Sequence, residues 1–251
     1  MTERRDLALR AMTDDGSLRV MTVDTTETVR AIVAAQRVGG EDARWLGELV
    51  TGTALIRETM SPDLRVQGIL QGVGARLQMM RTLPRGGVQQ GIVRVEGATG
   101  VSGALMLYLK ESEQVESAVA VSTIIEGGEV KAAGGYLVQL LPELDELVLT
   151  IMTVRLQSFP PMESLLREAH SPDAVLARLL ADLPYTELSR SPLRYQCRCD
   201  RVRLLQAMST VPRAEIESMV QEGKALEIGC DYCNAQYAID VAELRGLLRD
   251  N

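Results

Sequence analysis

In the amino-terminal part of the chain, the apolar residues first have the spacing of a strand and then, in two successive segments, the spacing of a helix. Residues 17–24 alternate apolar and polar side chains, which predicts a half-buried strand. Thr25 or Thr26 can then cap a helix that runs to about Val38. A second helix is predicted after a pair of glycines, and it ends before Pro62. Its apolar stripe has helical spacing: Trp45, Leu46, Leu49, Val50 and Ile56.

Further strands and helices are predicted up to residue 158. Residues 64–70 and 91–96 have the composition of strands, with glycine-rich turns between them. Residues 103–113 fit a helix, and the apolar, β-branched run at 117–125 fits a buried strand. A later helix carries apolar side chains on one face: Leu144, Leu147, Val148, Ile151 and Val154. Together they predict an α/β, sandwich-like domain over residues 1–158, with a mixed sheet and helices.

Residues 159–196 are interrupted by prolines. Because proline breaks helices, this segment is expected to form short helices at best and to behave as a linker. The prolines are Pro160, Pro161, Pro172, Pro184 and Pro192. The short helices nevertheless have an apolar face that must pack on another surface, so we expect a docked linker. That face consists of Leu165, Leu166, Val175, Leu176, Leu179 and Leu180.

Composition and charge narrow the class of protein. Apolar residues make up 46% of the chain and charged residues 24%, which is typical of a globular protein with a real core. Aromatic residues are only 3% while there are 11 methionines, so aliphatic and thioether side chains must fill that core. The net charge of −7 argues against binding to nucleic acids or anionic membranes, which need a basic face. Without a signal-peptide pattern or a membrane span, we expect a cytoplasmic protein.

Four cysteines lie in the last quarter of the chain, in residues 197–251. Cys197 and Cys199 form a C-x-C pair, and Cys230 and Cys233 form a C-x-x-C pair. In a reducing compartment, two such chelating pairs favour metal ligation over structural disulfides. Four thiolates suit a closed, tetrahedral zinc site, one Zn²⁺ per chain, in a module too small for a self-sufficient core. The overall expectation is an α+β protein with this zinc-binding α/β module at its carboxyl end.

The energetics of such a module allow a switch as well as a permanent zinc ribbon. Zinc binding contributes roughly 10–16 kcal/mol of apparent folding free energy in small modules and requires thiolates. If an oxidant joined the two cysteines within each pair, each disulfide would close a very small loop and replace little of that stabilisation. Nearby arginines could favour thiolates and attract anionic oxidants, or could form a solvated basic face. They are Arg194, Arg198, Arg201 and Arg203.

Other sites are weakly indicated. The only histidine, His170, is expected to be a surface or capping residue of the linker and not a metal ligand. Gly72, Val73 and Gly74 lack the rest of a dinucleotide-binding motif, and Gly134-Gly135 is expected to form a tight turn. No catalytic residue is predicted, and the protein is not expected to be an enzyme. Two alternatives stay open on the cysteines: a constitutive zinc-ribbon regulator or adaptor, and a thiol oxidoreductase using Cys230 and Cys233.

Longer motifs resemble one family. The segment 195–199 (YQCRC), followed by 230–237 (CDYCNAQY), is similar to the zinc module of the redox-regulated heat-shock chaperones called 33 kDa chaperonins. Residues 132–142 (AAGGYLVQLLP) resemble a signature of the family's amino-terminal domain, and Tyr108 with 112–114 (SEQ) resembles a second one. These motifs span most of the chain in the expected order.

The resemblance implies a redox-regulated, ATP-independent holdase of the stress response that binds unfolding client proteins. In the reduced state, Cys197, Cys199, Cys230 and Cys233 would hold zinc and the protein would be inactive. Oxidation to the disulfides Cys197–Cys199 and Cys230–Cys233 would release the metal, unfold the linker and produce an active homodimer. Residues 1–158 would then serve in dimerisation and client binding.

Two features depart from the family pattern. Asp200, Arg201 and Val202 follow the first cysteine pair where the family often has a small polar residue and then Glu-Arg, so thiol reactivity there is expected to differ. The chain is also a few dozen residues shorter than the family between Gly74 and Gly91, which affects strands of the first domain.

Overall fold

The structure, a computed structural model, divides into two compact units, Met1–Tyr195 and Gln196–Asn251. It describes residues 6–71, 76–83, 86–94, 100–142, 145–168 and 171–248. Among the helices described, none combines the length and apolarity needed to cross a bilayer.

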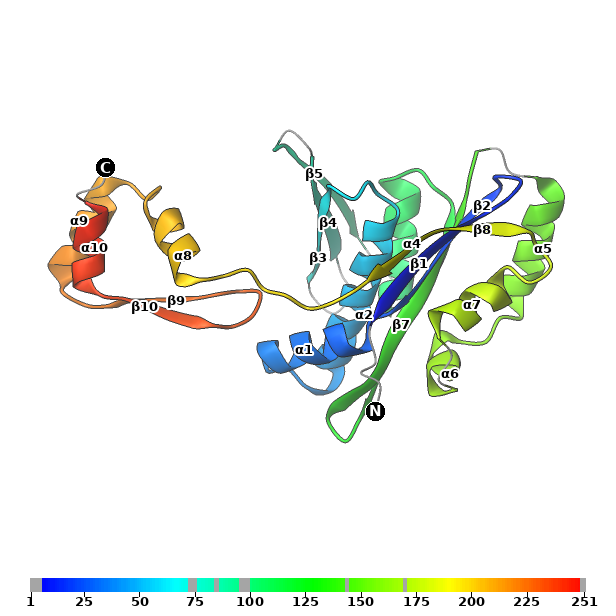
Figure 1. The fold of residues 1–251 in the computed structure, drawn as a ribbon, viewed down its shortest axis with the longest axis horizontal. Helices are drawn as coiled ribbons and strands as arrows, with labels where there is room; N and C mark the ends of the chain where they lie inside the picture. Colours follow the sequence, from blue (N-terminus) through cyan, green and yellow to red (C-terminus); the bar gives the residue numbers. More distant parts are fainter. Residues whose placement is uncertain are drawn as a thin grey trace. The chain divides into compact units, whose positions relative to one another are not determined.

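A five-stranded antiparallel sheet forms the centre of the first unit (Figure 1). Its strand order is β6-β7-β2-β1-β8, so β6 and β8 are the two edge strands. The strands are β1 (Leu7–Thr13), β2 (Leu18–Asp24), β6 (Ser117–Glu126), β7 (Glu129–Leu140) and β8 (Tyr185–Pro192). Because side chains alternate across a strand, the sheet presents two apolar faces, and both must be covered.

One face is covered by helices and by a second, three-stranded antiparallel sheet of order β3-β4-β5. On this side Met21 and Val23 of β2 join the core. The covering elements are α1 (Thr26–Gln36), α2 (Gly40–Glu58), β3 (Arg65–Gln71), β4 (Arg76–Thr82), β5 (Val88–Arg94) and α4 (Gly100–Glu111).

The opposite face is covered by α5 (Glu146–Gln157), α6 (Met162–Arg167) and α7 (Pro172–Leu179). Leu18 and Val20 of β2 point to this side. Figure 1 shows these three helices grouped on one side of the sheet, with α1, α2 and α4 on the other. The first unit is therefore a three-layer structure whose sheet has no solvent-facing side over its central strands.

The second unit has its own small core. Its described residues form α8 (Arg201–Met208), α9 (Arg213–Glu222), β9 (Leu226–Gly229), β10 (Gln236–Ile239) and α10 (Val241–Leu247). Strands β9 and β10 pair antiparallel. The buried apolar residues of this core are few: Met208, Ile216, Ile239 and Leu244.

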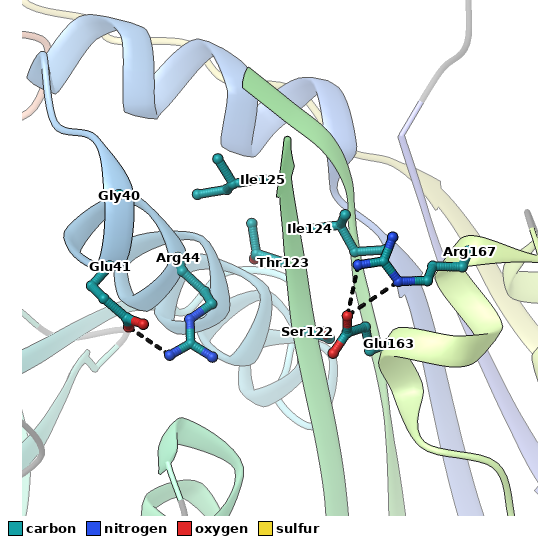
Figure 2. Close-up of a pocket in the computed structure, with 9 residues that line it drawn as sticks. All are labelled: Gly40, Glu41, Arg44, Ser122, Thr123, Ile124, Ile125, Glu163 and Arg167. Atoms are coloured by element: carbon teal, nitrogen blue, oxygen red, sulfur yellow. Dashed lines mark hydrogen bonds and ion pairs between the residues drawn. The ribbon is translucent and has the colours of Figure 1, made fainter. Parts of the chain in front are cut away.

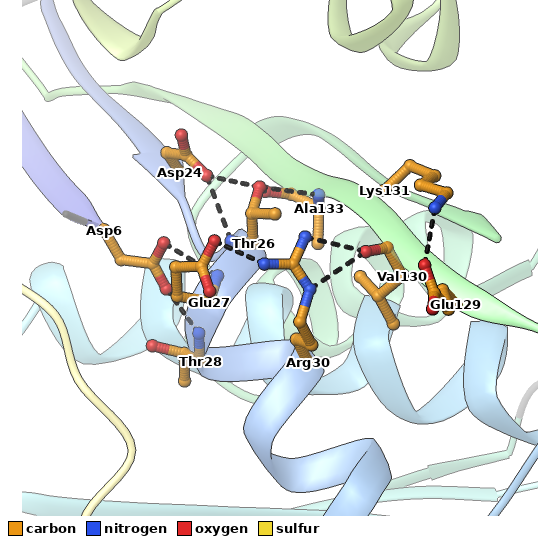
Figure 3. A network of polar contacts seen from close by, with 10 residues as sticks. All are labelled: Asp6, Asp24, Thr26, Glu27, Thr28, Arg30, Glu129, Val130, Lys131 and Ala133. Atoms are coloured by element: carbon orange, nitrogen blue, oxygen red, sulfur yellow. Dashed lines mark hydrogen bonds and ion pairs between the residues drawn. The ribbon is translucent and has the colours of Figure 1, made fainter. Parts of the chain in front are cut away.

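A polar network fixes the start of α1 (Figure 3). The carboxylate of Asp6, which is only 2% exposed, accepts hydrogen bonds from the backbone N–H groups of Glu27 and Thr28 at 2.9 and 2.6 Å. Asp24 accepts from the N–H and the hydroxyl of Thr26. Thr25 is the N-cap residue of α1, as predicted, but its side chain makes no capping hydrogen bond, because its hydroxyl is hydrogen-bonded to that of Thr51 instead. The N–H groups at the start of α1 are instead capped by Asp6, which is distant in sequence, and by Asp24, which precedes the helix.

The apolar side chains predicted to dock the proline-containing segment are all buried: Leu165, Leu166, Val175, Leu176, Leu179 and Leu180. Ser171 caps α7, and Pro172 occupies its first turn, where a missing N–H costs nothing. Beyond α7 the chain returns as β8, which pairs with β1 along its whole length. The first compact unit consequently extends past residue 158, since this segment supplies two covering helices and an edge strand.

The α+β fold class is confirmed, and so are most of the predicted elements before residue 158. All described strand pairs are antiparallel, whereas we expected a mixed sheet. Strands β1, β4, β7 and β8 were not predicted. In β7 the burial pattern is nearly continuous, because the strand lies inside the sheet with helices on both faces, so it has no period of two.

Two further predictions are wrong. Gly134 and Gly135 lie within β7 and not in a turn. A Cβ atom on Gly135 would come within 2.6 Å of the Ala120 carbonyl oxygen, so the sheet requires glycine there. In α5, Leu147 and Val154 are 68% and 61% exposed, and Met152 is the buried residue. Leu144, Gly72 to Gly74, Glu96 and His170 lie outside the described residues.

We predict that Asp6→Ala destabilises the first unit by about 2 kcal/mol, because two N–H groups at the start of α1 lose their acceptor. Urea unfolding followed by the fluorescence of Trp45, the only tryptophan of the chain, measures this unit alone. Asp6→Asn, which keeps one acceptor oxygen, is expected to lose less. Equal losses in the two variants would contradict the capping role.

Candidate metal centre

Two short segments of the second unit carry the four cysteines. Cys197 and Cys199 lie in the extended segment before α8, and Asp200 directly after them caps that helix through the N–H of Arg203. The other pair lies in the turn between β9 and β10. The first turn of α8 and the β9–β10 hairpin therefore set the positions of the two pairs.

Backbone hydrogen bonds shape the turn that carries the second pair. The N–H of Cys230 donates to the carbonyl oxygen of Ala235 at 2.9 Å, and the N–H of Asn234 donates to the carbonyl oxygen of Cys230 at 2.7 Å. Asn234 adopts a left-handed conformation with φ of 58°, which asparagine tolerates better than most residues. The tight turn brings Cys230 and Cys233 to the same side.

The four sulfur atoms form one cluster. All of them lie within 4.8 Å of one another. The distance between the sulfurs of Cys197 and Cys230 is 3.7 Å, and that between Cys199 and Cys233 is 3.2 Å. A tetrahedral ion bound at about 2.3 Å separates its sulfur ligands by about 3.8 Å. The predicted grouping of these cysteines is confirmed, and the cluster has the size that a tetrahedral metal ion needs.

A tyrosine adds a hydrogen bond to the cluster. The hydroxyl of Tyr237, on β10, donates to the sulfur of Cys199 at 3.2 Å. This bond, with those from the neighbouring thiols, lowers the pKa of Cys199 to about 7. The same bond raises the pKa of the Tyr237 hydroxyl to about 12. The sequence motif contains Tyr237, but no spacing rule assigns it to the cluster.

The thiols of Cys197 and Cys233 ionise less readily, since the pKa of each is raised. The backbone N–H of Ala235 lowers the pKa of Cys233, but hydrogen bonds shared with the neighbouring thiols and burial outweigh it and raise that pKa to about 12. Four thiolates this close repel one another, so all four can be ionised together only around a cation. The residues present fit a divalent ion with soft sulfur ligands.

Two of the four arginines near the first pair, Arg201 and Arg203, have structural partners. Arg201 donates to Glu243 of α10 and to the carbonyl oxygen of Ala238, which links the start of α8 to α10. Arg203 donates to the carbonyl oxygen of Arg198, the residue between the first two cysteines, at 3.0 Å. Asp200 and Arg201, where the chain departs from the expected pattern, thus belong to the scaffold of the cluster.

Comparison with known proteins decides the family. A family model described as Hsp33 protein matches residues 6–76 and 62–240, which together make up most of the chain. The chain belongs to the Hsp33 family. Its resemblance to the 33 kDa chaperonins is therefore confirmed, and Hsp33 membership supports a chaperone function.

One Hsp33 relative aligns over nearly the whole chain, and another aligns over a shorter segment with higher identity. A 33 kDa chaperonin of Syntrophotalea carbinolica is 29% identical over 97% of this chain and 99% of its own length. One from Streptococcus pyogenes serotype M49 is 38% identical over 144 residues, which cover 57% of this chain and half of the relative. The first alignment runs over 286 positions, so that relative has segments that this 251-residue chain lacks.

A solved structure has the same fold. The crystal structure of the 33 kDa chaperonin from Thermotoga maritima superposes with a TM-score of 0.81 and covers 98% of this chain and 99% of the other. The two sequences are 20% identical in that alignment. The arrangement of the sheets and helices is thus shared with a protein of very different sequence.

We predict that removing the metal unfolds the second unit and leaves the core around Trp45 intact. A strong chelator, added to reduced protein, should lower the helical signal in circular dichroism, because four buried apolar residues cannot hold the unit alone. The emission of Trp45 should stay unchanged. Cys230→Ser protein should already show the loss and respond no further to chelator. A full helical signal after chelation would contradict a metal-dependent fold.

We also predict that Tyr237→Phe weakens metal binding by about tenfold, because a hydrogen bond that favours the thiolate of Cys199 is lost. Competition with a colorimetric chelator measures the affinity. Tyr232→Phe is the matched control, since Tyr232 lies in the same hairpin and is 63% exposed. The role of Tyr237 fails if the two variants bind metal equally.

Proposed function

We propose that the protein is an ATP-independent holdase that is inactive when reduced and that binds unfolding proteins after oxidation. The observation that carries this proposal is the cluster of four sulfur atoms in a unit with so small an apolar core. Family membership supports the chaperone activity itself. The proposed redox control is supported by the chemistry of the four thiols, which can bind a metal when reduced but not when oxidised to disulfides.

Zinc is the proposed metal. A tetrahedral set of four thiolates with no open position is typical of structural zinc sites. When bound, zinc would supply a crosslink between the segment before α8 and the β9–β10 turn. Cys197, Cys199, Cys230 and Cys233 would hold it, and no enzymatic use of the ion is proposed, because a closed site leaves no place for a substrate or a water molecule.

Oxidation would remove that crosslink. We propose the disulfides Cys197–Cys199 and Cys230–Cys233, formed when two thiols lose two protons and pass two electrons to hypochlorite or peroxide. The sulfur distances of 3.7 Å between Cys197 and Cys230 and of 3.2 Å between Cys199 and Cys233 both run between the pairs. Disulfides within the pairs would leave the two segments unconnected. The second unit would then lose the contact that joins its halves.

The segment next to the second unit covers the proposed surface for clients. Residues 159–196 are the proposed linker, between a domain of residues 1–158 and a switch domain of residues 197–251. Their helices α6 and α7 cover apolar residues of the large sheet, among them Leu9, Leu18 and Val20. If the linker unfolds, these side chains become exposed, and a surface of this kind binds unfolding proteins and supports a homodimer.

Polar contacts hold α6 only weakly. A pocket of about 450 Å³ lies at β6 and is lined by residues of α2, β6 and α6 (Figure 2). Arg167 pairs with Glu126 and with Glu163 of its own helix, but these side chains are about half exposed, so the pairs contribute little. Arg44, on the α2 side, pairs with Glu41 of its own helix. Docking of α6 therefore depends on its buried apolar residues, Met162, Leu165 and Leu166.

We predict that the oxidised protein suppresses the aggregation of a thermally unfolding client while the reduced protein does not. Light scattering of the client, with zinc release followed in the same sample by a colorimetric chelator, measures both events. Equal suppression in the two states would rule out redox control. No suppression in either state would exclude the holdase function.

A pair of leucines tests the docked linker without touching a cysteine. Leu179→Ala removes a fully buried side chain from α7 and is expected to cost about 2–5 kcal/mol. The reduced variant should then suppress part of the aggregation. Leu188→Ala, in the same segment, is the control because Leu188 is 44% exposed. Equal behaviour of the two variants would show that undocking does not activate the protein.

A further inference from the structure

The outer face of the three-stranded sheet carries cationic side chains and no acidic ones. In this sheet Gln78 of β4 lies opposite Ile69 of β3 and Ile92 of β5, and such cross-strand partners share a face. The alternate residues Leu77, Met79 and Val93 are buried against the helices. Each strand has seven residues, and none of the three strands contains Asp or Glu. This is unusual in a chain with 34 acidic residues and a net charge of −7.

Three arginines on the outer face have no carboxylate partner among the described residues. Arg65, Arg76 and Arg94 are exposed, and Arg76 lies opposite Arg94 on the neighbouring strand. Like charges directly opposite one another destabilise a sheet. The fourth arginine of the sheet, Arg81, points inward and pairs with Glu113 at 3.0 Å. An anionic partner would relieve the repulsion on the outer face.

Glutamine amides fill the positions between these charges. Gln67, Gln71 and Gln90 are exposed, Gln78 is half-buried, and none of them forms a side-chain hydrogen bond with a described residue. An amide side chain can both donate to a carbonyl oxygen and accept from an N–H group. Val88 and Ile92, which are 58% and 48% exposed, add apolar contact area. The face thus offers what an extended polypeptide needs: hydrogen bonds to its backbone, apolar contacts and positive charge.

The face is held rigidly by the elements beneath it. A Cβ atom on Gly68 would lie 2.4 Å from the hydroxyl oxygen of Thr53 of α2, and one on Gly91 would lie 2.2 Å from that of Ser112, just after α4. The strands therefore rest directly on these segments. Tyr108 and Arg81 both hydrogen-bond to Glu113, which ties α4 to β4. A preformed face of this kind loses little entropy on binding.

We propose that the outer face of β3, β4 and β5 binds an extended polypeptide segment that carries acidic side chains. Seven residues in a strand span about 20 Å, enough for a segment of similar length. Nucleic acid fits less well, because the face has no aromatic side chain on which a base could stack. The sheet packs on the side of the large sheet that α6 and α7 do not cover. Binding therefore requires neither oxidation nor release of the linker.

Fluorescence anisotropy with a labelled peptide in which glutamate alternates with valine tests the proposal on reduced protein. The triple variant Arg65→Gln, Arg76→Gln, Arg94→Gln should bind about tenfold more weakly, a change of about 1.4 kcal/mol. The control is Arg37→Gln, Arg194→Gln, Arg245→Gln, which changes the net charge equally at exposed arginines elsewhere. A peptide with lysine in place of glutamate should not bind.

Several results would overturn the proposal. No binding of the glutamate peptide, equal losses in the two triple variants, or equal binding of the lysine peptide would each do so. Tighter, Arg65-dependent binding of a labelled single-stranded DNA would assign the face to nucleic acid instead. If the first triple variant fails to fold, hydrogen exchange of the wild-type protein with and without the peptide tests the site. The peptide should slow the exchange of amides in β3 to β5. Slower exchange only in other parts of the chain would refute the site. Because the reduced protein is used, failure here leaves the redox-controlled holdase function untouched.

Discussion

The second unit depends on a contact between two cysteine pairs that are far apart in sequence. Its apolar core contains Met208, Ile216, Ile239 and Leu244 as buried residues, too few to offset the entropy lost when the chain folds. The sulfur atoms lie where one ion can join the segment before α8 to the β9–β10 turn. Helix caps at Asp200 and Asp240 organise the helices locally, but they do not replace that connection. In the proposed metal-bound form, the stability of the unit would thus be concentrated in a few metal–sulfur bonds, whose formation depends on the ionisation and redox state of the sulfur.

The first unit distributes its stability in the opposite way. Its five-stranded sheet is covered on both faces, and each face has a separate apolar cluster. The elements that cover one face, from α1 to α4, all precede β7 in the sequence. The opposite face is covered by α5, α6 and α7, which follow β7. The segment that leads into the second unit is therefore part of the core of the first. The buried residues of α6 and α7 belong to the apolar cluster on one face of the sheet, and the cluster around Leu55, Leu105 and Leu137 lies on the other face.

Much of this structure could be predicted from the sequence, and the limits have physical causes. The cysteine spacing identified the cluster, because few arrangements of two chelating pairs are open to a short chain. The buried leucines of the proline-containing segment showed that it is docked. In contrast, β8 has a largely exposed, polar sequence, and only its pairing with β1 makes it a strand. The sequence also did not predict that Asp6 caps α1 or that Tyr237 hydrogen-bonds to Cys199, because only the tertiary fold brings these residues to their partners.

The position of β8 at the edge of the large sheet has a topological consequence. Strand β1 is an inner strand only because β8 pairs with it from Leu7 to Thr13. Release of β8 would leave a row of backbone N–H and C=O groups along β1 without partners, next to an apolar face. Such an edge is a template for the addition of another strand. The chain would then be able to recruit extended polypeptides through their backbones, irrespective of their side chains, and the same edge would need shielding from neighbouring copies.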